Sequence, residues 1–168
     1  MNILAIDPGN TRSAVVGYDS DTHELHAAAI LPNSSLLSGI ESYSGCTHLA
    51  IEMVACYGMP VGREVFDTCL WVGRFVQAWQ ALSICNSHTL VYRRHVKLWL
   101  CNSARAKDSN VRQALLDKFP ATGGGKTPQV GTKSQPGPLY GVAKDIWAAL
   151  GVAVTFTESP DFAEARRG

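Results

Sequence analysis

The sequence predicts an α/β fold in which helices flank a mixed, five-stranded central sheet. Two observations support this prediction: three strand-like segments follow one another at the start of the chain, and helical and strand-like segments alternate after them. Consecutive strands joined by short turns favour an antiparallel meander, whereas strands separated by helices favour parallel pairing. We expect one domain over residues 1–168, because a chain of this length buries one sizeable core.

Short apolar runs mark the expected strands. Residues 2–6 are apolar and lead into Asp-Pro-Gly, which is typical of a strand that is buried on both faces and stopped by a turn. Residues 11–18 and 24–31 are expected to form the next two strands, joined by a polar turn. The last two strands are predicted at residues 48–54 and 89–92.

The spacing of apolar residues marks the helices. One long amphipathic helix is predicted by apolar side chains at steps of three and four residues, namely Val65, Cys69, Val72, Val76 and Trp79. Shorter helices are expected at residues 95–101, 110–119 and 142–156. Two stretches rich in turn residues are expected to be loops: residues 32–44, with at most a short helix, and residues 121–138, which we expect to be mobile.

Composition narrows the class of protein. The first residues carry neither the basic start nor the apolar stretch of a signal sequence, and no window approaches the roughly 20 apolar residues that span a bilayer. We therefore expect a cytoplasmic protein that does not contact a membrane. The five cysteines are widely spaced without a CxxC pair, so reduced thiols in the core are favoured over a disulfide framework. A cysteine site for a metal with His48 or His88 is an alternative that no spacing supports.

Positive charge is concentrated in one segment of the chain. Residues 93–133 contain nine Lys or Arg against two Asp, whereas the remainder contains six against twelve acidic residues, although the whole chain has a formal charge of only +1. A basic segment on an acidic body favours binding of a polyanion. The alternative is an ordinary solvated surface.

Three acidic residues far apart in the sequence are candidate metal ligands. Asp7 and Glu52 each stand near the end of an apolar strand, where an unpaired carboxylate in a dry environment is costly and favours a cation partner. Asp145 is expected in the first turn of the last helix. Hard cations such as Mg²⁺ prefer oxygen ligands, and two of them together activate water and stabilise a leaving phosphodiester oxygen. Taken singly, each acid also suits a structural role: a turn, an exposed strand end or a helix start.

Four segments of the chain resemble the successive motifs of RuvC-like Holliday junction resolvases, particularly the compact bacteriophage versions. They are ILAIDPGNTRSAVVGYD, HLAIEMVACYGMPVGREVFDTCLWVGRF, VYRRHVKLWLCNSARAKDSNVRQALLDKF and GPLYGVAKDIWAALGVAV. The resemblance implies the ribonuclease H-like fold and a homodimeric endonuclease of bacterial or phage origin. Such an enzyme resolves four-way junctions and other branched DNA with two Mg²⁺ ions, or Mn²⁺, per active site, without a small-molecule cofactor, and leaves 5′-phosphate and 3′-hydroxyl ends.

The resemblance also assigns roles to individual residues. It makes Asp7, Glu52 and Asp145 the catalytic metal ligands. The family has another ligand one helical turn before the last, where this chain has Val142, so the second metal site is short of a ligand. After Glu52 the family places a loop that enters the junction centre. Here Tyr57 and Met59 are the available stacking groups, with Tyr57 as the preferred wedge and simple packing as the alternative.

Phosphate contacts and a dimer surface complete the expected DNA-binding apparatus. The expected phosphate contacts are basic residues, which neutralise the backbone without reading sequence, namely Arg93, Arg94, Lys97, Arg105, Lys107, Lys126 and Lys133. Lys144, adjacent to Asp145, is expected to touch the scissile phosphate, with a solvated lysine as the alternative. The dimer surface is expected on the long helix from Arg63, where the candidate contacts, equally suited to a core, are Phe66, Leu70, Phe75 and Trp79.

Three other interpretations compete with this one. Asp7, Gly9 and Thr11 match the phosphate-binding pattern of actin-like kinases, but that fold needs two such domains and this chain is too short for them. The YqgF branch of the same fold, linked to ribosomal RNA maturation, also opens with Asp-Pro-Gly, but the segment around Glu52 argues against it. A catalytically silent DNA-binding relative stays open because Val142 replaces a ligand.

Overall fold

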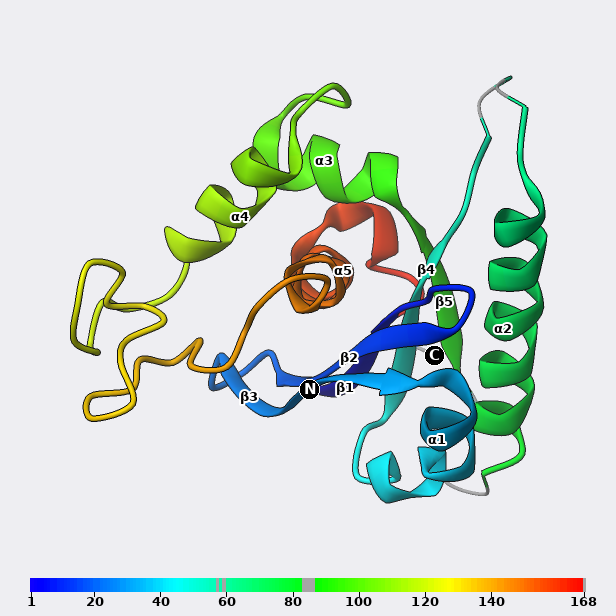
Figure 1. Cartoon of the computed structure of the whole chain (residues 1–168), viewed down its shortest axis with the longest axis horizontal. Coiled ribbons are helices and arrows are strands. Elements are labelled where there is room, and N and C mark those ends of the chain that lie inside the picture. Colours follow the sequence, from blue (N-terminus) through cyan, green and yellow to red (C-terminus); the bar gives the residue numbers. More distant parts are fainter. Residues whose placement is uncertain (57, 59, 83–86, 168) are drawn as a thin grey trace.

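In the computed structural model, the chain forms a five-stranded sheet with helices on both faces (Figure 1). The structure describes residues 1–56, 58, 60–82 and 87–167. The strands lie in the order β3-β2-β1-β4-β5, with β1–β3 antiparallel and β4 and β5 joined to them in parallel. Their bounds are β1 Asn2–Asp7, β2 Arg12–Asp19, β3 Glu24–Pro32, β4 His48–Met53 and β5 His88–Tyr92. The predicted α/β class with a mixed five-stranded sheet is confirmed.

The central strand β1 is buried on both faces because its apolar residues alternate between two cores. Ile3 and Ala5 belong to one cluster, Leu4 and Ile6 belong to the other, and all four side chains are 0% exposed. The cluster around Leu4 contains residues of α1 (Asn33–Ser38), of the 3₁₀ helix Ile40–Tyr43 and of α2 (Arg63–Gln80). These helices therefore cover one face of the sheet (Figure 1).

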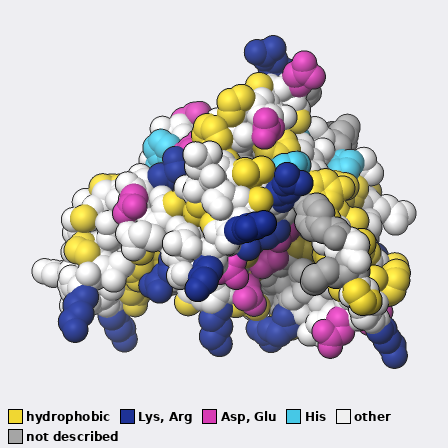
Figure 2. Space-filling view, turned by 90° about the horizontal axis from the view of Figure 1, so that it is seen from above, with side chains coloured by type: hydrophobic (Ala, Val, Ile, Leu, Met, Phe, Trp, Pro, Cys, Tyr) yellow, Lys and Arg dark blue, Asp and Glu magenta, His cyan; other side chains and the backbone are white. Residues whose placement is uncertain are grey.

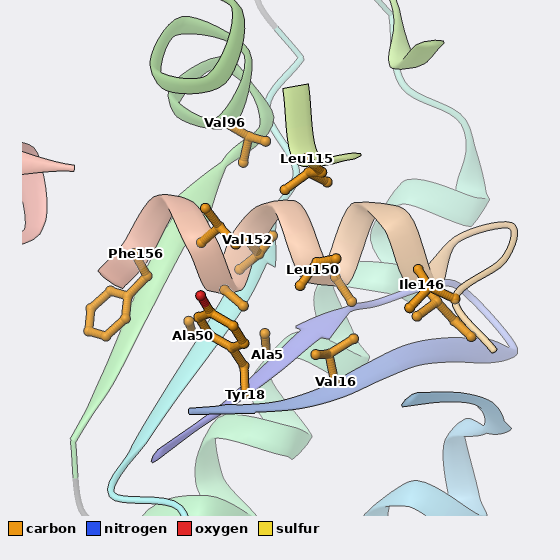
Figure 3. Packing of buried hydrophobic residues seen from close by; sticks show 14 of the residues in the cluster. Ala5, Val16, Tyr18, Ala50, Val96, Leu115, Ile146, Leu150, Val152 and Phe156 are labelled. Carbon is orange, nitrogen blue, oxygen red and sulfur yellow. The ribbon is translucent and has the colours of Figure 1, made fainter. Parts of the chain in front are cut away.

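Three helices cover the opposite face: α3 (Arg93–Cys101), α4 (Asp108–Leu116) and α5 (Ile146–Glu158). Helix α5 lies directly on the strands, and α3 and α4 pack on top of it (Figure 1). Figure 3 shows Ala5 and Val16 on the sheet side of α5, with Val96 and Leu115 on its other side. Apolar groups therefore surround α5 in its middle, and its position relative to the sheet is fixed by packing. The chain ends with a short 3₁₀ helix, Pro160–Phe162.

The largest deviation from the predicted elements concerns the start of α5. A helix was expected from residue 142, but α5 begins at Ile146. The preceding turn contains Gly141 with φ 89° and Lys144 with φ 49°, and these left-handed conformations do not occur within a right-handed helix. The smaller deviations are the starts of α3 and α4, which lie two residues earlier than predicted, whereas the short helix α1 was allowed for in the loop of residues 32–44.

The stretch of residues 121–138 is a loop, but it is closed by its own hydrogen bonds, in contrast to the mobile segment we expected. Backbone N–H groups of Gly123, Gly124 and Gly137 donate to carbonyl groups elsewhere in the same loop. Gly131 has φ 76°, and a side chain there would lie 2.3 Å from the backbone nitrogen of Gly137. The glycines are therefore required by close backbone approach.

Cysteines and membrane contact were also part of the sequence expectation. Cys46 is buried and the partly buried Cys101 packs against the core, whereas Cys56 is exposed and Cys69 is only partly buried, so the expectation of core thiols is wrong for Cys56 and Cys69. Cys85 lies outside the described residues. Within the described ranges, no helix is both long enough and apolar enough to cross a membrane.

Helix α2 separates the four residues that were proposed for the dimer surface into two pairs. Phe75 and Trp79 are 0% exposed and belong to the core under the sheet, so their expected role as dimer contacts is wrong. The Trp79 indole N–H also donates to the carbonyl of Ser87. Phe66 and Leu70, one helical turn apart, are 64% and 55% exposed. Only this second pair is available to a partner.

Phe75→Ala and Phe66→Ala form a matched test of this division. We expect Phe75→Ala to lower the free energy of unfolding by about 3–5 kcal/mol, because it leaves a cavity in a closed core. Phe66→Ala removes the same atoms from the surface and is expected to change the stability of the monomer by less than about 0.5 kcal/mol. Urea unfolding at low protein concentration measures both values. Equal losses in the two variants would contradict the placement of Phe75.

Candidate functional site

Two acidic side chains lie next to each other at one edge of the sheet. Ile6 of β1 pairs with Ile51 of β4 in the parallel ladder, so Asp7 and Glu52 are the next residues on the two adjacent strands. Because side chains alternate along a strand, both acids point to the face that α5 covers. The sheet register alone therefore brings together two carboxylates that are 45 residues apart in the sequence.

The third acid, Asp145, reaches the same region from the start of α5. It is the N-cap residue, one position before the helix, and not part of the first turn as expected. Its side chain makes no capping hydrogen bond, so the carboxylate is not used to satisfy the helix end. The charge of Asp145 contributes to raising the pKa of Asp7, which places the two groups within electrostatic reach of each other.

Burial makes this acidic pair unusual. Loss of solvent raises the pKa of Asp7 from its ordinary value to about 6, while the positive charge of Arg93 opposes that change. Loss of solvent likewise raises the pKa of Glu52 to about 7, and the neighbouring charge of Asp7 adds to the effect. The charged forms of both groups are therefore destabilised, and a nearby cation would stabilise them.

Arg93 supplies one cationic group at this site. It follows β5 directly and is the first residue of α3. Its Nη2 donates to Oδ1 of Asp108 at 2.7 Å, whereas its Nη1 lies 3.5 Å from Oε2 of Glu52. The second contact has the distance of an ion pair without hydrogen-bond geometry, and both of its atoms are buried without a hydrogen-bond partner. Arg93, expected only as a phosphate contact, is thus a counter-ion of the acidic pair.

Asp108 is a residue of the site that sequence reasoning missed. The segment around it was interpreted as a helix cap, and α4 does begin at Asp108, with Lys107 at the N-cap. Its charge, however, contributes to raising the pKa of both Asp7 and Glu52. A signal was present, because Asp108 is one of only two acidic residues in the basic segment 93–133.

The acids fit a hard divalent cation in kind but are not yet arranged around one. Carboxylate oxygens are the ligands that Mg²⁺ prefers, and the buried Oε2 of Glu52 lacks the hydrogen-bond partner that such an atom normally has. In the described part of the chain, no three His, Cys, Asp or Glu side chains stand close enough together to hold an ion. The side chain of Arg93 lies against Glu52 instead.

The turn before α5 explains what happens at position 142. Val142 is 4% exposed and packs in the core with Leu139 and Ile146, so the side chain at this position is committed to packing. Lys144 is exposed and stands next to Asp145. It lines a hollow of about 470 Å³ together with Arg112 and Trp147, whose guanidinium and ring are stacked with 5.1 Å between the guanidinium carbon and the ring centroid.

The basic residues expected to contact DNA lie on α3 and on the segments that follow it in the chain. Arg93, Arg94 and Lys97 line one hollow of about 390 Å³. The exposed side chains on neighbouring segments are those of Arg105, Lys107, Lys126 and Lys133. Figure 2 shows acidic side chains gathered near the middle of one face, with Lys and Arg side chains on several sides of them. Tyr57 and Met59, the expected wedge residues, lie outside the described residues.

Comparison with solved structures identifies the fold. A structure of T. thermophilus RuvC in complex with a Holliday junction substrate superposes with a TM-score of 0.64 at 14% sequence identity, covering 94% of this chain and 93% of that chain. A second Thermus thermophilus RuvC structure gives a TM-score of 0.59 at 15% identity and the same coverage. No protein-family model and no curated protein matches the sequence. The chain therefore has the ribonuclease H-like fold of the RuvC structures.

Proposed function

We propose that this protein is a Mg²⁺-dependent endonuclease that cuts branched DNA, with the four-way junction as its preferred substrate. The observation that carries the proposal is the pair of partly buried carboxylates, Asp7 and Glu52, at adjacent strand ends, with Asp145 within electrostatic reach of Asp7. The likeness of the fold to RuvC bound to a Holliday junction supports the choice of substrate. The basic residues around the acids supply the attraction for a nucleic-acid backbone.

In this mechanism Asp7, Glu52 and Asp145 would hold two divalent ions. Such ions would supply an activated water and would stabilise charge on the leaving oxygen of the phosphodiester. Arg94, Lys97 and the other basic side chains neutralise backbone phosphates and orient the strand. Lys144, beside Asp145, contacts the scissile phosphate. No protein nucleophile is needed, and the products carry 5′-phosphate and 3′-hydroxyl ends.

We further propose that two copies associate through the exposed face of α2. Phe66 and Leu70 are large apolar side chains in solvent on the face of α2 that points away from the sheet. A two-fold dimer presents two active sites to two equivalent strands, which matches the symmetry of a four-way junction. The paired cuts that resolve a junction require such an arrangement.

A second candidate function is a junction-binding protein without nuclease activity. The observation that favours it is the commitment of Val142 to the core, which leaves position 142 without an oxygen or nitrogen ligand. In that case the basic surface would bind branched DNA while the acidic pair stayed protonated or paired with Arg93. Binding without cleavage would separate this candidate from the nuclease.

The first prediction of the nuclease proposal concerns substrate and metal. With Mg²⁺ or Mn²⁺ we expect paired, symmetric nicks in a labelled four-way junction, and slower or no cutting of linear duplex of the same sequence and of an RNA stem-loop. With Ca²⁺ we expect binding without cutting. Denaturing gels measure the rates, and end-labelling identifies the 5′-phosphate. Preferred cutting of RNA would support the YqgF-like alternative, and binding with no cutting in any metal would support the silent relative.

The second prediction concerns the first acid. Asp7→Asn should lower the rate of junction cleavage by more than about 100-fold, because a neutral amide replaces an anionic ligand. Binding of the junction in Ca²⁺ should stay within about threefold of the parent protein, since phosphate contacts dominate affinity. The matched control is Asp21→Asn, which alters an exposed acid paired with the N-terminus beyond the opposite end of β1. Cleavage by Asp7→Asn at the rate of the parent protein would contradict the assignment of Asp7 as a metal ligand.

The third prediction concerns the pH dependence of stability without metal. The pKa values of Asp7 and Glu52 are raised in the folded chain, so their contribution to stability is present at low pH and is lost as pH rises through about 6 and about 7, respectively. His48 acts in the opposite direction, because burial lowers its pKa to about 4. Comparing the parent protein with Asp7→Asn therefore removes the contribution of His48 and reports Asp7 together with its effect on the pKa of Glu52.

Between about pH 4.5 and about pH 7.5, the parent protein should lose about 2 kcal/mol of unfolding free energy relative to Asp7→Asn. Urea unfolding in EDTA measures both proteins. A difference between the two proteins that does not change with pH would show that Asp7 has an ordinary pKa and is not in the dry pair described above.

A further inference from the structure

We propose, resting on the proposed function, that the guanidinium group of Arg93 and a divalent cation are alternative partners of Glu52, and that Asp108 retains Arg93 when the cation takes its place. Arg93 is thus a positioning residue that couples the binding of the metal ion to the binding of the DNA backbone.

The sheet places Arg93 where a cation is required. Glu52 pairs with Val91 in the parallel β4–β5 ladder, and Arg93 follows two residues after Val91. Arg93 therefore stands immediately beyond the end of β5, and its contact with Glu52 shows that its side chain points to the same face. The side chains of Arg93 and Glu52 are only 26% and 16% exposed, so this contact is largely shielded from solvent.

The contact between Arg93 and Glu52 is the weaker of the two that Arg93 makes. The separation of Nη1 and Oε2 is 3.5 Å, and neither atom has a hydrogen bond. Nη2, by contrast, donates to Asp108 at 2.7 Å, which is the distance of a strong, charge-assisted bond. Breaking the contact with Glu52 therefore sacrifices an ion pair of poor geometry, while Asp108 still compensates the guanidinium charge.

Glu52 does not serve both partners at once. A divalent cation bound at Oε2 would place two positive charges beside the positive charge of Arg93 in a poorly solvated site, where like charges repel strongly. Loading of the site thus requires Arg93 to turn away.

A hollow beside Arg93 can accept its guanidinium group when that group leaves Glu52. Arg93 also lines the hollow of about 390 Å³ that it shares with Arg94 and Lys97 on α3. Turned away from Glu52, the Arg93 side chain adds its charge to this hollow, where a backbone phosphate is a suitable ligand. When a metal ion is bound, the charge of Arg93 therefore adds to the positive charge of the hollow that faces DNA. When the metal site is empty, Arg93 pairs with Glu52 and that charge is absent from the hollow.

The test measures Mg²⁺ affinity in DNA-free protein by calorimetry at fixed pH and ionic strength. Arg93→Gln removes the competing charge and is expected to tighten Mg²⁺ binding by about tenfold or more. Arg93→Lys keeps the charge and should stay within about threefold of the parent. Arg94→Gln is the matched control, since it removes the same charge from the exposed neighbouring residue, and it too should stay within about threefold. Circular dichroism establishes that each variant is folded.

Asp108→Asn tests the retaining role by a double-mutant cycle. In the parent protein this change leaves Glu52 as the remaining anionic partner of Arg93, so Mg²⁺ binding should weaken. In the Arg93→Gln background the same change should have an effect at least about threefold smaller. Equal weakening in both backgrounds would mean that Asp108 acts on the metal directly, and it would overturn the retaining role.

The outcomes separate this inference from the function on which it rests. If the parent protein binds Mg²⁺ and Asp7→Asn does not, the proposed metal site is supported. Unchanged or weaker Mg²⁺ binding by folded Arg93→Gln would then overturn only the proposed exchange, in which Arg93 and the cation replace each other as partners of Glu52. If neither the parent protein nor Arg93→Gln binds Mg²⁺, the proposed function fails, and the exchange fails with it. Tighter binding in Arg93→Gln but not in Arg94→Gln supports the exchange.

Discussion

Two partly buried carboxylates held side by side at the end of a sheet are the constraint on which the rest of this structure depends. The register of β1 and β4 forces Asp7 and Glu52 together, and α5 limits their access to water. Neighbouring anions in such a place are tolerated only with protons or cations. The raised pKa values of Asp7 and Glu52 favour bound protons, and Arg93 supplies a neighbouring cation. A bound divalent ion would compensate the two charges in a third way, which is the one that the proposed function requires.

The part of this site that could be predicted from the sequence is the part fixed by local pattern. Apolar runs located β1 and β4, and an acid at the end of each run was sufficient to suggest Asp7 and Glu52. The start of α5 was misplaced because it depends on left-handed conformations at Gly141 and Lys144, which propensity does not reveal for a lysine.

The pairing of Arg93 with Glu52 and Asp108 could not be predicted for a different reason. It joins side chains from three elements, and the contact exists only because α3 begins immediately after β5 and α4 packs against α3. From the sequence alone, the basic residues of segment 93–133 cannot be told apart, and all of them suit contacts with phosphate. Tertiary structure divides them into one partly buried counter-ion and several exposed cations.

Helix α5 is buried along most of its length and carries Asp145 at its tip, near the C-terminal end of these 168 residues. During translation the first two acids therefore leave the ribosome long before the third. A nascent chain that stops short of α5 has strands with an uncovered apolar face and an acidic pair open to water. Without α5, and with it Asp145, the proposed metal site is therefore incomplete.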